Sequence, residues 1–230
     1  MPPALRKLLK NARLKHVQKG QVLLYAGDRP AEVQIIKEGI VKLHNIDEQG
    51  NEKILHLLRS PMVIPLAFFS RPEATTKWYY TALTECDLCV LNREELEQLM
   101  ETDKKTMLFL VNNFSEDVHE ILTRLDSLGK SDSSAKLAAA LCYLALRHGT
   151  RYSSGWWKVL FPVSHQLLAD MTGVARETVS LAMKVLSDKK IIRNPHLTQL
   201  EIHLDRLESY RQEVLIGYDT SQPISSSSRP

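Results

Sequence analysis

Apolar and polar side chains alternate with a period of two along much of residues 14–92. The predicted strands occupy residues 21–25, 33–36, 40–44 and 53–58. Glycines stand between or beside these runs, at positions 20, 27, 39 and 50. Short runs of this kind, separated by glycine turns, are typical of an antiparallel sheet that closes on itself. The pattern therefore predicts a small antiparallel β-barrel or jelly roll.

Near Arg93 the spacing of apolar residues lengthens to a helical period, and Asn92 is suited to cap a helix that starts there. Farther along, apolar side chains recur at alternating intervals of four and three, at Met107, Val111, Phe114, Val118, Ile121, Leu125 and Leu128. Such a seam, along a helix of about 26 residues and about 39 Å, indicates a coiled coil. We expect the partner helix to come from a second copy of the chain. Packing of the seam on the chain's own barrel is the alternative.

The helical period returns in residues 135–147, and an apolar run at 156–161 predicts a strand. Residues 163–192 form the most informative segment, because they predict two short helices joined by a tight turn. A small hairpin, or wing, is expected at 190–202, and a last helix at 205–213.

Two residues fix the predicted helical pair. Ser164 is suited to the N-cap of its first helix. Gly173 supplies the turn, for one of two reasons: a Cβ atom there would crowd the second helix, or it would oppose a positive φ. Both reasons remain open at the level of the sequence.

The outer face of the second helix carries side chains suited to reading DNA bases. Arg176, Glu177 and Ser180 would lie there, and arginine binds guanine O6 and N7 while glutamate accepts a hydrogen bond from cytosine N4. Polar residues that could contact the DNA backbone are Ser164, His165, Gln166, Thr178, Lys184, Lys189, Lys190 and Arg193. The alternative is an ordinary amphipathic helical hairpin with a solvated charged face.

The net charge of +3 is unevenly distributed over the 230 residues. Residues 1–132 hold 18 Lys and Arg against 19 Asp and Glu, a net charge of −1. Residues 133–213 hold 11 against 7, a net charge of +4. The basic part is the one with the candidate DNA motif, as phosphate binding requires.

The chain has no run of 18 apolar residues and no secretory signal pattern at its N-terminus. We therefore expect a cytoplasmic protein that does not enter a membrane. Three cysteines without such a signal argue against a disulfide framework. Cys86 and Cys89 are interpreted as small strand residues, with a redox pair as the alternative.

We find no Ser/His/Asp grouping, phosphate loop or paired carboxylates that would indicate an enzyme. The eight histidines are scattered without the spacing of metal ligands. The sequence therefore predicts neither a catalytic site nor a metal site, and no cofactor.

The segment VSHQLLADMTGVARETVSLAMKVLSDKKII resembles the winged-helix signature of the cyclic-AMP receptor protein/FNR superfamily of transcription regulators. The stretch KGQVLLYAGDRPAEVQIIKEGIVKLHNIDEQGNEKILHLL is similar to the sensor barrel of that superfamily, its glycines included. Barrel, long helix and winged helix occur in the family's order, so the resemblance covers about residues 14–205.

This resemblance implies an α+β fold in three parts. They are an N-terminal antiparallel β jelly-roll domain like those that bind cyclic nucleotides (residues 1–103), a long dimerisation helix (104–131) and a C-terminal winged helix-turn-helix domain (132–213). Residues 214–230, which end in PISSSSRP, are expected to be a disordered tail.

The resemblance also implies how DNA is read. Arg176 and Glu177 match the family's Arg-Glu pair, and Ser180 matches a base-contacting serine of the FNR branch. The arginine that commonly follows is replaced by Leu181, so this chain departs from the family at that base contact. A half-site that contains TGA is the resulting hypothesis.

The sensor departs further from the family. Cyclic-nucleotide binders carry Gly-Glu and then Arg-Ser or Arg-Thr in a phosphate cassette, whereas this chain has Pro65 and Thr76-Lys77 at about those places. The iron–sulfur branch needs an N-terminal cysteine cluster, which is absent, and the haem branch needs a histidine that residues 57–85 lack. An unidentified apolar or aromatic effector is one interpretation, with a pocket made by Ile64, Leu66, Phe68, Arg71, Lys77, Trp78 and Tyr80. Core packing of these side chains and a regulator without an effector are the alternatives.

The sequence thus predicts a homodimeric, sequence-specific DNA-binding transcription regulator that does not depend on a cyclic nucleotide. Its partners would be double-stranded DNA, at a palindromic site, and RNA polymerase. The alternative from another class is a ligand-sensing or scaffold module whose helical domain binds protein.

Overall fold

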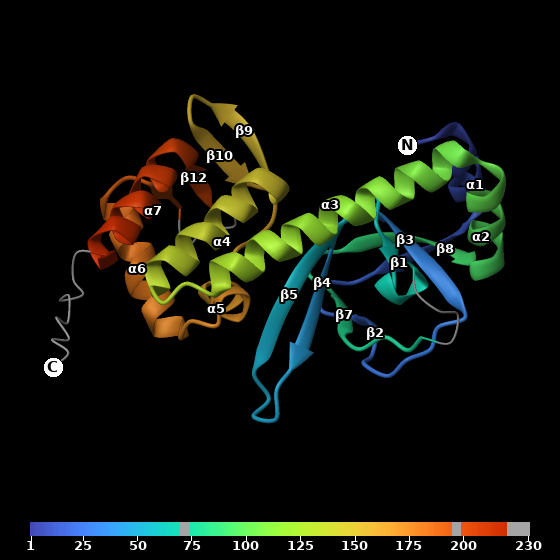
Figure 1. Cartoon of the computed structure of the whole chain (residues 1–230), viewed down its shortest axis with the longest axis horizontal. Coiled ribbons are helices and arrows are strands. Elements are labelled where there is room, and N and C mark those ends of the chain that lie inside the picture. The colour runs from blue at the N-terminus through green and yellow to red at the C-terminus, as the bar shows by residue number, and fades with distance from the viewer. Residues whose placement is uncertain (70–73, 195–198, 220–230) are drawn as a thin grey trace, which may run out of the picture. The chain divides into compact units, whose positions relative to one another are not determined.

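The computed structural model describes residues 1–69, 74–194 and 199–219, the last five of them by backbone only, and they fall into two compact units (Figure 1). The first unit runs from Met1 to Leu122, and the second begins at Thr123. This boundary lies inside helix α3 (Lys104–Leu128), earlier than the start at residue 132 expected for the second domain.

Two antiparallel sheets of four strands form the first unit. In spatial order, one sheet contains β1 (Arg13–Val17), β8 (Cys86–Asn92), β3 (Glu32–Glu38) and β6 (Val63–Ile64). The other contains β2 (Val22–Leu24), β7 (Tyr79–Ala82), β4 (Ile40–Ile46) and β5 (Glu52–Arg59). The predicted antiparallel jelly-roll domain is confirmed.

Strand β3 has a continuous buried run, apolar except for Gln34, because both of its faces are covered. Ile36 packs into the core between strands of the two sheets, with Val41 and Leu88. Val33 and Ile35 point to the other face and pack against helices that surround the sheet. A strand with two buried faces loses the period-two alternation that marks half-exposed strands.

Three short helices complete the first unit, α1 (Pro3–Asn11), η1 (Leu66–Phe69) and α2 (Arg93–Thr102). Helix α1 was not predicted; it buries Leu5 against the outer face of β3. Asn92 precedes α2 as expected, although its side chain makes no capping hydrogen bond. Helix α3 starts after Asp103, whose Oδ2 accepts hydrogen bonds from the N–H and the hydroxyl of Thr106 at 3.2 and 2.6 Å.

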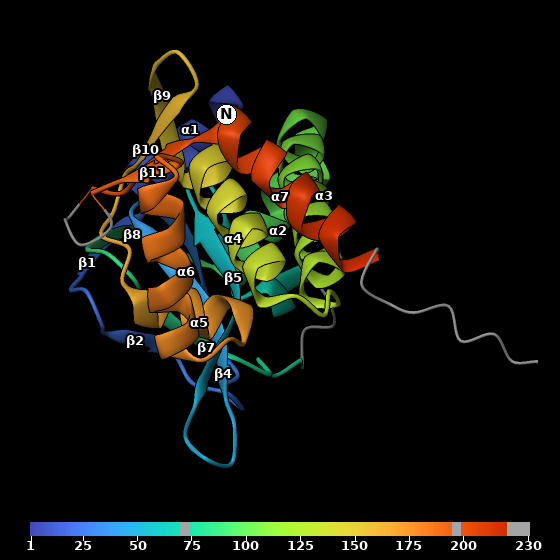
Figure 2. The ribbon, with the colours of Figure 1, turned by 90° about the vertical axis from the view of Figure 1, so that its left-hand side faces the viewer.

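The second unit combines helices with a third antiparallel sheet. Its helices are α4 (Ser133–His148), α5 (His165–Thr172), α6 (Arg176–Asp188) and α7 (Leu204–Asp219). The sheet has the spatial order β11 (Ile192–Arg193), β12 (Glu201–His203), β10 (Trp156–Val159) and β9 (Gly149–Ser153). Figure 2 shows α5 and α6 in orange and α4 beside α7. The predicted winged helix-turn-helix fold is confirmed.

Two expectations at the C-terminal end change. Helix α7 continues to Asp219, so the disordered tail predicted from residue 214 begins too early. The apolar residues 214–216 extend the helical pattern past the predicted end at 213. The wing strands pair as expected, with Ile192 opposite Ile202. Of the turn that the sequence predicts at 194–196, residues 195 and 196 lie outside the described residues.

Cys86 and Cys89 are both buried in β8. Because they are three positions apart on one strand, their side chains point to opposite faces of the sheet. Burial also raises the pKa of each thiol. This geometry supports the interpretation as strand residues over that of a redox pair.

Candidate nucleic-acid interface and sensor site

The α5–turn–α6 segment has the geometry that its sequence predicts. The Oγ atom of Ser164 accepts a hydrogen bond from the N–H of Leu167 at 3.0 Å and caps α5. Gly173 follows α5 with a φ of +67°, and its N–H donates to the carbonyl of Ala169. A Cβ atom at Gly173 would meet nothing within 4 Å. The positive φ, and not crowding of the second helix, therefore explains this glycine.

Helix α6 has two opposite faces. Val179, Met183 and Leu186 are fully buried and fix the helix on the unit. The other face is exposed, and its side chains are Arg176, Glu177, Thr178, Ser180, Leu181 and Lys184. The three residues predicted to contact bases thus lie together on the exposed face, at the N-terminal half of α6.

Two exposed side chains of α6 are apolar, Leu181 and, one turn later, Val185, which is 44% exposed. Leu181 is 69% exposed, one turn after Glu177 and next to Ser180. Burial does not explain a leucine at this position.

The residues predicted to contact the DNA backbone lie at three places. Ser164, His165 and Gln166 lie at the start of α5. Thr178 and Lys184 lie on the exposed face of α6. The segment after α6 carries Lys189, Lys190 and Arg193. Two of them already contact aromatic rings of the same unit. The Arg193 guanidinium lies 3.9 Å from the centroid of the Trp156 ring, and the Lys189 ammonium lies 4.9 Å from that of Tyr210.

Arg124 supports the helical pair, although sequence reasoning did not select it. Its guanidinium is buried, and Nη2 donates to the carbonyl of Met171 near the C-terminal end of α5 at 3.1 Å. It also lies 5.3 Å from the centroid of the Tyr143 ring on α4. A cation at a helix C-terminus is favoured by the helix dipole. In the sequence, Arg124 lies between the seam residues Ile121 and Leu125, and no local pattern there indicates this role.

The predicted seam of α3 divides into an exposed stripe and inward-facing positions. Met107, Val111, Val118, Leu125 and Leu128 are exposed, and Leu122 joins them. Phe114 instead packs on the barrel, with its ring 4.9 Å from that of Phe69. Ile121 is half-buried. We define the α3 stripe as Met107, Val111, Val118, Leu122 and Leu125.

The predicted effector cassette belongs largely to the barrel core. Ile64 and Tyr80 are fully buried in the core between the sheets, and Leu66 and Trp78 pack against it. The Tyr80 hydroxyl accepts a hydrogen bond from the N–H of Leu66 at 3.0 Å. Lys77 is exposed, and Arg71 lies outside the described residues. These placements favour the core-packing interpretation for Ile64 and Tyr80.

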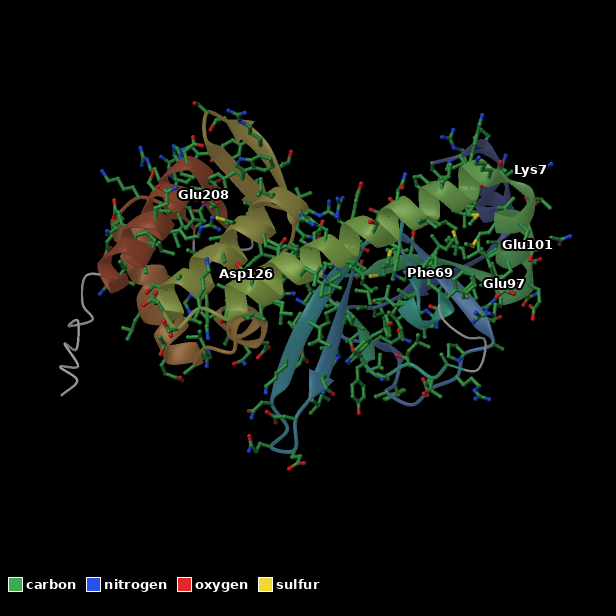
Figure 3. All side chains as sticks on the ribbon, viewed as in Figure 1. Lys7, Phe69, Glu97, Glu101, Asp126 and Glu208 are labelled. Atoms are coloured by element: carbon green, nitrogen blue, oxygen red, sulfur yellow. The ribbon has the colours of Figure 1, made fainter. Side chains whose placement is uncertain are left out.

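A cavity of about 400 Å³ lies beside η1 and α2 in the first unit. Its lining comes from η1, α2 and the first turn of α3, and consists of Phe68, Phe69, Arg93, Glu97, Met100, Glu101 and Met107. Figure 3 labels Phe69, Glu97 and Glu101 among them. The guanidinium of Arg93 donates to Glu97 and to the carbonyl of Phe68, and it stacks on the Phe68 ring. Of the predicted cassette, Phe68 lines this cavity.

A second group of polar side chains meets between β5 and α3. One ligand-type atom each from His56, Asp117 and Glu120 lies within 4.8 Å of the others. Sequence spacing missed this group because 61 positions separate His56 from Asp117. The available signal was a histidine in the buried, apolar alternation of β5.

Two domain families match the chain, and together they cover most of it. Residues 14–103 match the cyclic nucleotide-binding domain, and residues 135–210 match the Crp-like helix-turn-helix domain. The chain belongs to the CRP/FNR family of transcription regulators. This family consists of DNA-binding regulators, not enzymes, which agrees with the absence of a predicted catalytic grouping.

CRP/FNR relatives share the architecture at low sequence identity. The global nitrogen regulator of Nostoc is 23% identical over 81% of this chain and 83% of its own length. The cAMP-activated global transcriptional regulator CRP of Haemophilus influenzae is 22% identical, with coverages of 83% and 84%. The structure of FixK2 from Bradyrhizobium japonicum superposes with a TM-score of 0.72 at 18% identity, over 86% of this chain and 96% of that one. Among the described residues of this CRP/FNR chain, no helix is long and apolar enough to span a membrane.

Proposed function

We propose that this CRP/FNR regulator binds a palindromic DNA site as a homodimer, with one α6 helix in the major groove of each half-site. The main support is the exposed face of α6, where Arg176, Glu177 and Ser180 lie together above a fully buried apolar stripe. Side chains on such a face reach base edges without disturbing the packing of the helix. The protein would work in the cytoplasm, where its DNA is, and contact RNA polymerase when its site lies upstream of a promoter.

The α3 stripe is the proposed dimer contact. Five exposed apolar side chains along one helix would be costly in water, and a second copy can bury them in a two-helix coiled coil. Two α6 helices in one dimer can then engage successive turns of the major groove, about 34 Å apart.

We further propose that DNA binding does not require a cyclic nucleotide. A cyclic phosphate needs a guanidinium and backbone donors, and a ribose hydroxyl needs a carboxylate. Residues 62–69 offer neither side chain, and one backbone donor of this stretch, the N–H of Leu66, is taken by the hydroxyl of the buried Tyr80.

Selection of bound fragments from genomic DNA, followed by gel-shift titration of the selected site, tests the function. We expect a palindromic site and an affinity that falls by about 1,000-fold or more between 50 and 200 mM salt. Cyclic AMP should leave the shift unchanged. A helical domain that binds protein instead would select no DNA sequence and give no salt-dependent shift.

Replacing Glu177 by alanine is expected to relax selection at one base pair of each half-site, by about 1–3 kcal/mol, because the carboxylate that accepts from a base is lost. Sequencing of sites selected from a random library measures this. Asp188→Ala is the control, since Asp188 is an exposed carboxylate at the far end of the same helix. Unchanged selection by the Glu177 variant would remove this residue from base reading.

Leu181 is expected to contact the C5-methyl group of a thymine, because that group is the apolar feature of the major groove. Replacing that thymine by uracil should weaken binding by roughly 3- to 10-fold for the wild type, and Leu181→Ala should abolish the difference. Leu160→Ala is the control, because Leu160 is 68% exposed but lies off the helix. Equal affinity of the wild type for thymine and uracil at every position would contradict this role.

A further inference from the structure

We propose that His56, Asp117 and Glu120 form a binding site for one divalent transition-metal ion. His56 lies on β5, and the two carboxylates lie on α3 three positions apart, so they share one face of the helix. The three ligand-type atoms lie within 4.8 Å of one another. All three residues belong to the first unit.

The distance between two of the atoms suits a shared ion. Nε2 of His56 and Oδ1 of Asp117 form a long hydrogen bond of 3.4 Å. Strong N–H···O hydrogen bonds are shorter, about 2.9 Å. Two ligands at about 2.1 Å from a tetrahedral Zn²⁺ ion are about 3.4 Å apart. The observed separation therefore already matches one edge of a zinc site, and Glu120 has to approach by a rotation of its side chain.

The surroundings of His56 also point to a ligand. His56 is 0% exposed, between the buried residues Ile54 and Leu58 on the same face of β5. Burying a polar group is unfavourable unless it is paired, and the Asp117 carboxylate supplies a partner for the imidazole here. Half-buried carboxylates face it from Asp117 and Glu120. A cation between them would contact the imidazole nitrogen and both carboxylates together, in place of the hydrogen bond between His56 and Asp117.

The ligand set selects the kind of ion. Imidazole nitrogen favours Zn²⁺ and neighbouring transition metals, whereas Mg²⁺ and Ca²⁺ prefer oxygen ligands alone. Three protein ligands leave one position of a tetrahedral ion open, for water or another small ligand. The ion would join β5 to α3, the helix that carries the proposed dimer stripe. Its action as an effector rests on the proposed function, whereas the metal site itself does not.

Calorimetric titration of ZnCl₂ into the untagged, chelator-treated full-length chain tests the site. We expect one Zn²⁺ per chain, at least tenfold weaker binding for Asp117→Asn and for Glu120→Gln, and no effect of Mg²⁺. Glu116→Gln is the matched control, an exposed carboxylate on the same helix. Both test variants keep the size of the side chain, and thermal melting without metal verifies that they fold.

The metal site and its role as an effector are tested by separate outcomes. Absence of Zn²⁺ binding by the wild type, or equal affinity of all variants, would overturn the site. Gel shifts with and without Zn²⁺ then test the effector role, for which we expect at least a tenfold change in DNA affinity in the wild type and none in Glu120→Gln. If Zn²⁺ leaves the DNA affinity unchanged, the effector role is overturned, whereas the metal site is still decided by calorimetry. If the protein shifts no DNA under either condition, the proposed DNA binding is contradicted instead.

Discussion

Replacement of Leu125 by aspartate is expected to leave the chain monomeric and to weaken its affinity for a two-half-site DNA by on the order of 100-fold. Leu125 is 64% exposed on the α3 stripe, so the change should spare the fold. In a dimer, however, it would place two carboxylates in an apolar seam. Both half-sites must be bound by linked subunits for tight binding, so loss of the dimer also removes most of the affinity.

Sedimentation velocity and gel-shift titration measure the two effects of Leu125→Asp. Leu160→Asp is the control, because it adds the same charge at an equally exposed leucine outside α3. Leu125 is a cleaner target than Ile121, which is half-buried. A Leu125 variant that sediments as a dimer would exclude the α3 stripe as the interface.

Gly39→Ala is expected to destabilise the barrel more than any other glycine-to-alanine change between its strands, by about 3 kcal/mol or more. Gly39 joins β3 to β4 with a φ of +91°, which side chains rarely adopt. An added Cβ would also meet the carbonyl oxygen of Glu85 and the Sγ atom of Cys86, at 2.3 and 2.6 Å. A backbone atom cannot give way as a side chain does, so strand β8 would have to shift.

Gly50→Ala separates the cost of the positive φ from the cost of the clash with Glu85 and Cys86. Gly50 has a φ of +84° but nothing within 4 Å of an added Cβ, so we expect it to cost about 1 kcal/mol from the backbone alone. Urea unfolding followed by circular dichroism compares the two variants. Equal losses of stability would show that the contact with β8 is relieved without cost.

The sequence was most informative where one face of an element is exposed. Strand β4 shows a regular alternation and helix α6 an apolar stripe, because polar residues occupy the side of each element that faces the solvent. Strand β3 lacks this contrast, since both faces are buried, and could be predicted only as an apolar run. Helix α1 carries an apolar stripe, Leu5, Leu8 and Leu9, but its nine residues are too few for a helical period to stand out in the sequence.

The residues of the candidate sites also differ in how far the sequence predicts them. The exposed face of α6 follows from local periodicity, so Arg176, Glu177 and Ser180, the residues proposed to read bases, could be placed together from the sequence alone. The seam residues could be listed, but not divided between solvent and barrel, because the heptad pattern treats Phe114 and Val118 alike. The meeting of His56 with α3 depends on the closure of the barrel, which no local pattern encodes.

Arg124 has a practical consequence for anyone who wants to dissect the protein. Its guanidinium, on α3, holds the last turn of α5 through the carbonyl of Met171. A fragment cut between α3 and α4, just before Ser133, would leave that carbonyl buried without its donor. A fragment that begins at Thr123 retains it. The DNA-reading half of the chain is therefore best isolated with the last turns of the long helix still attached.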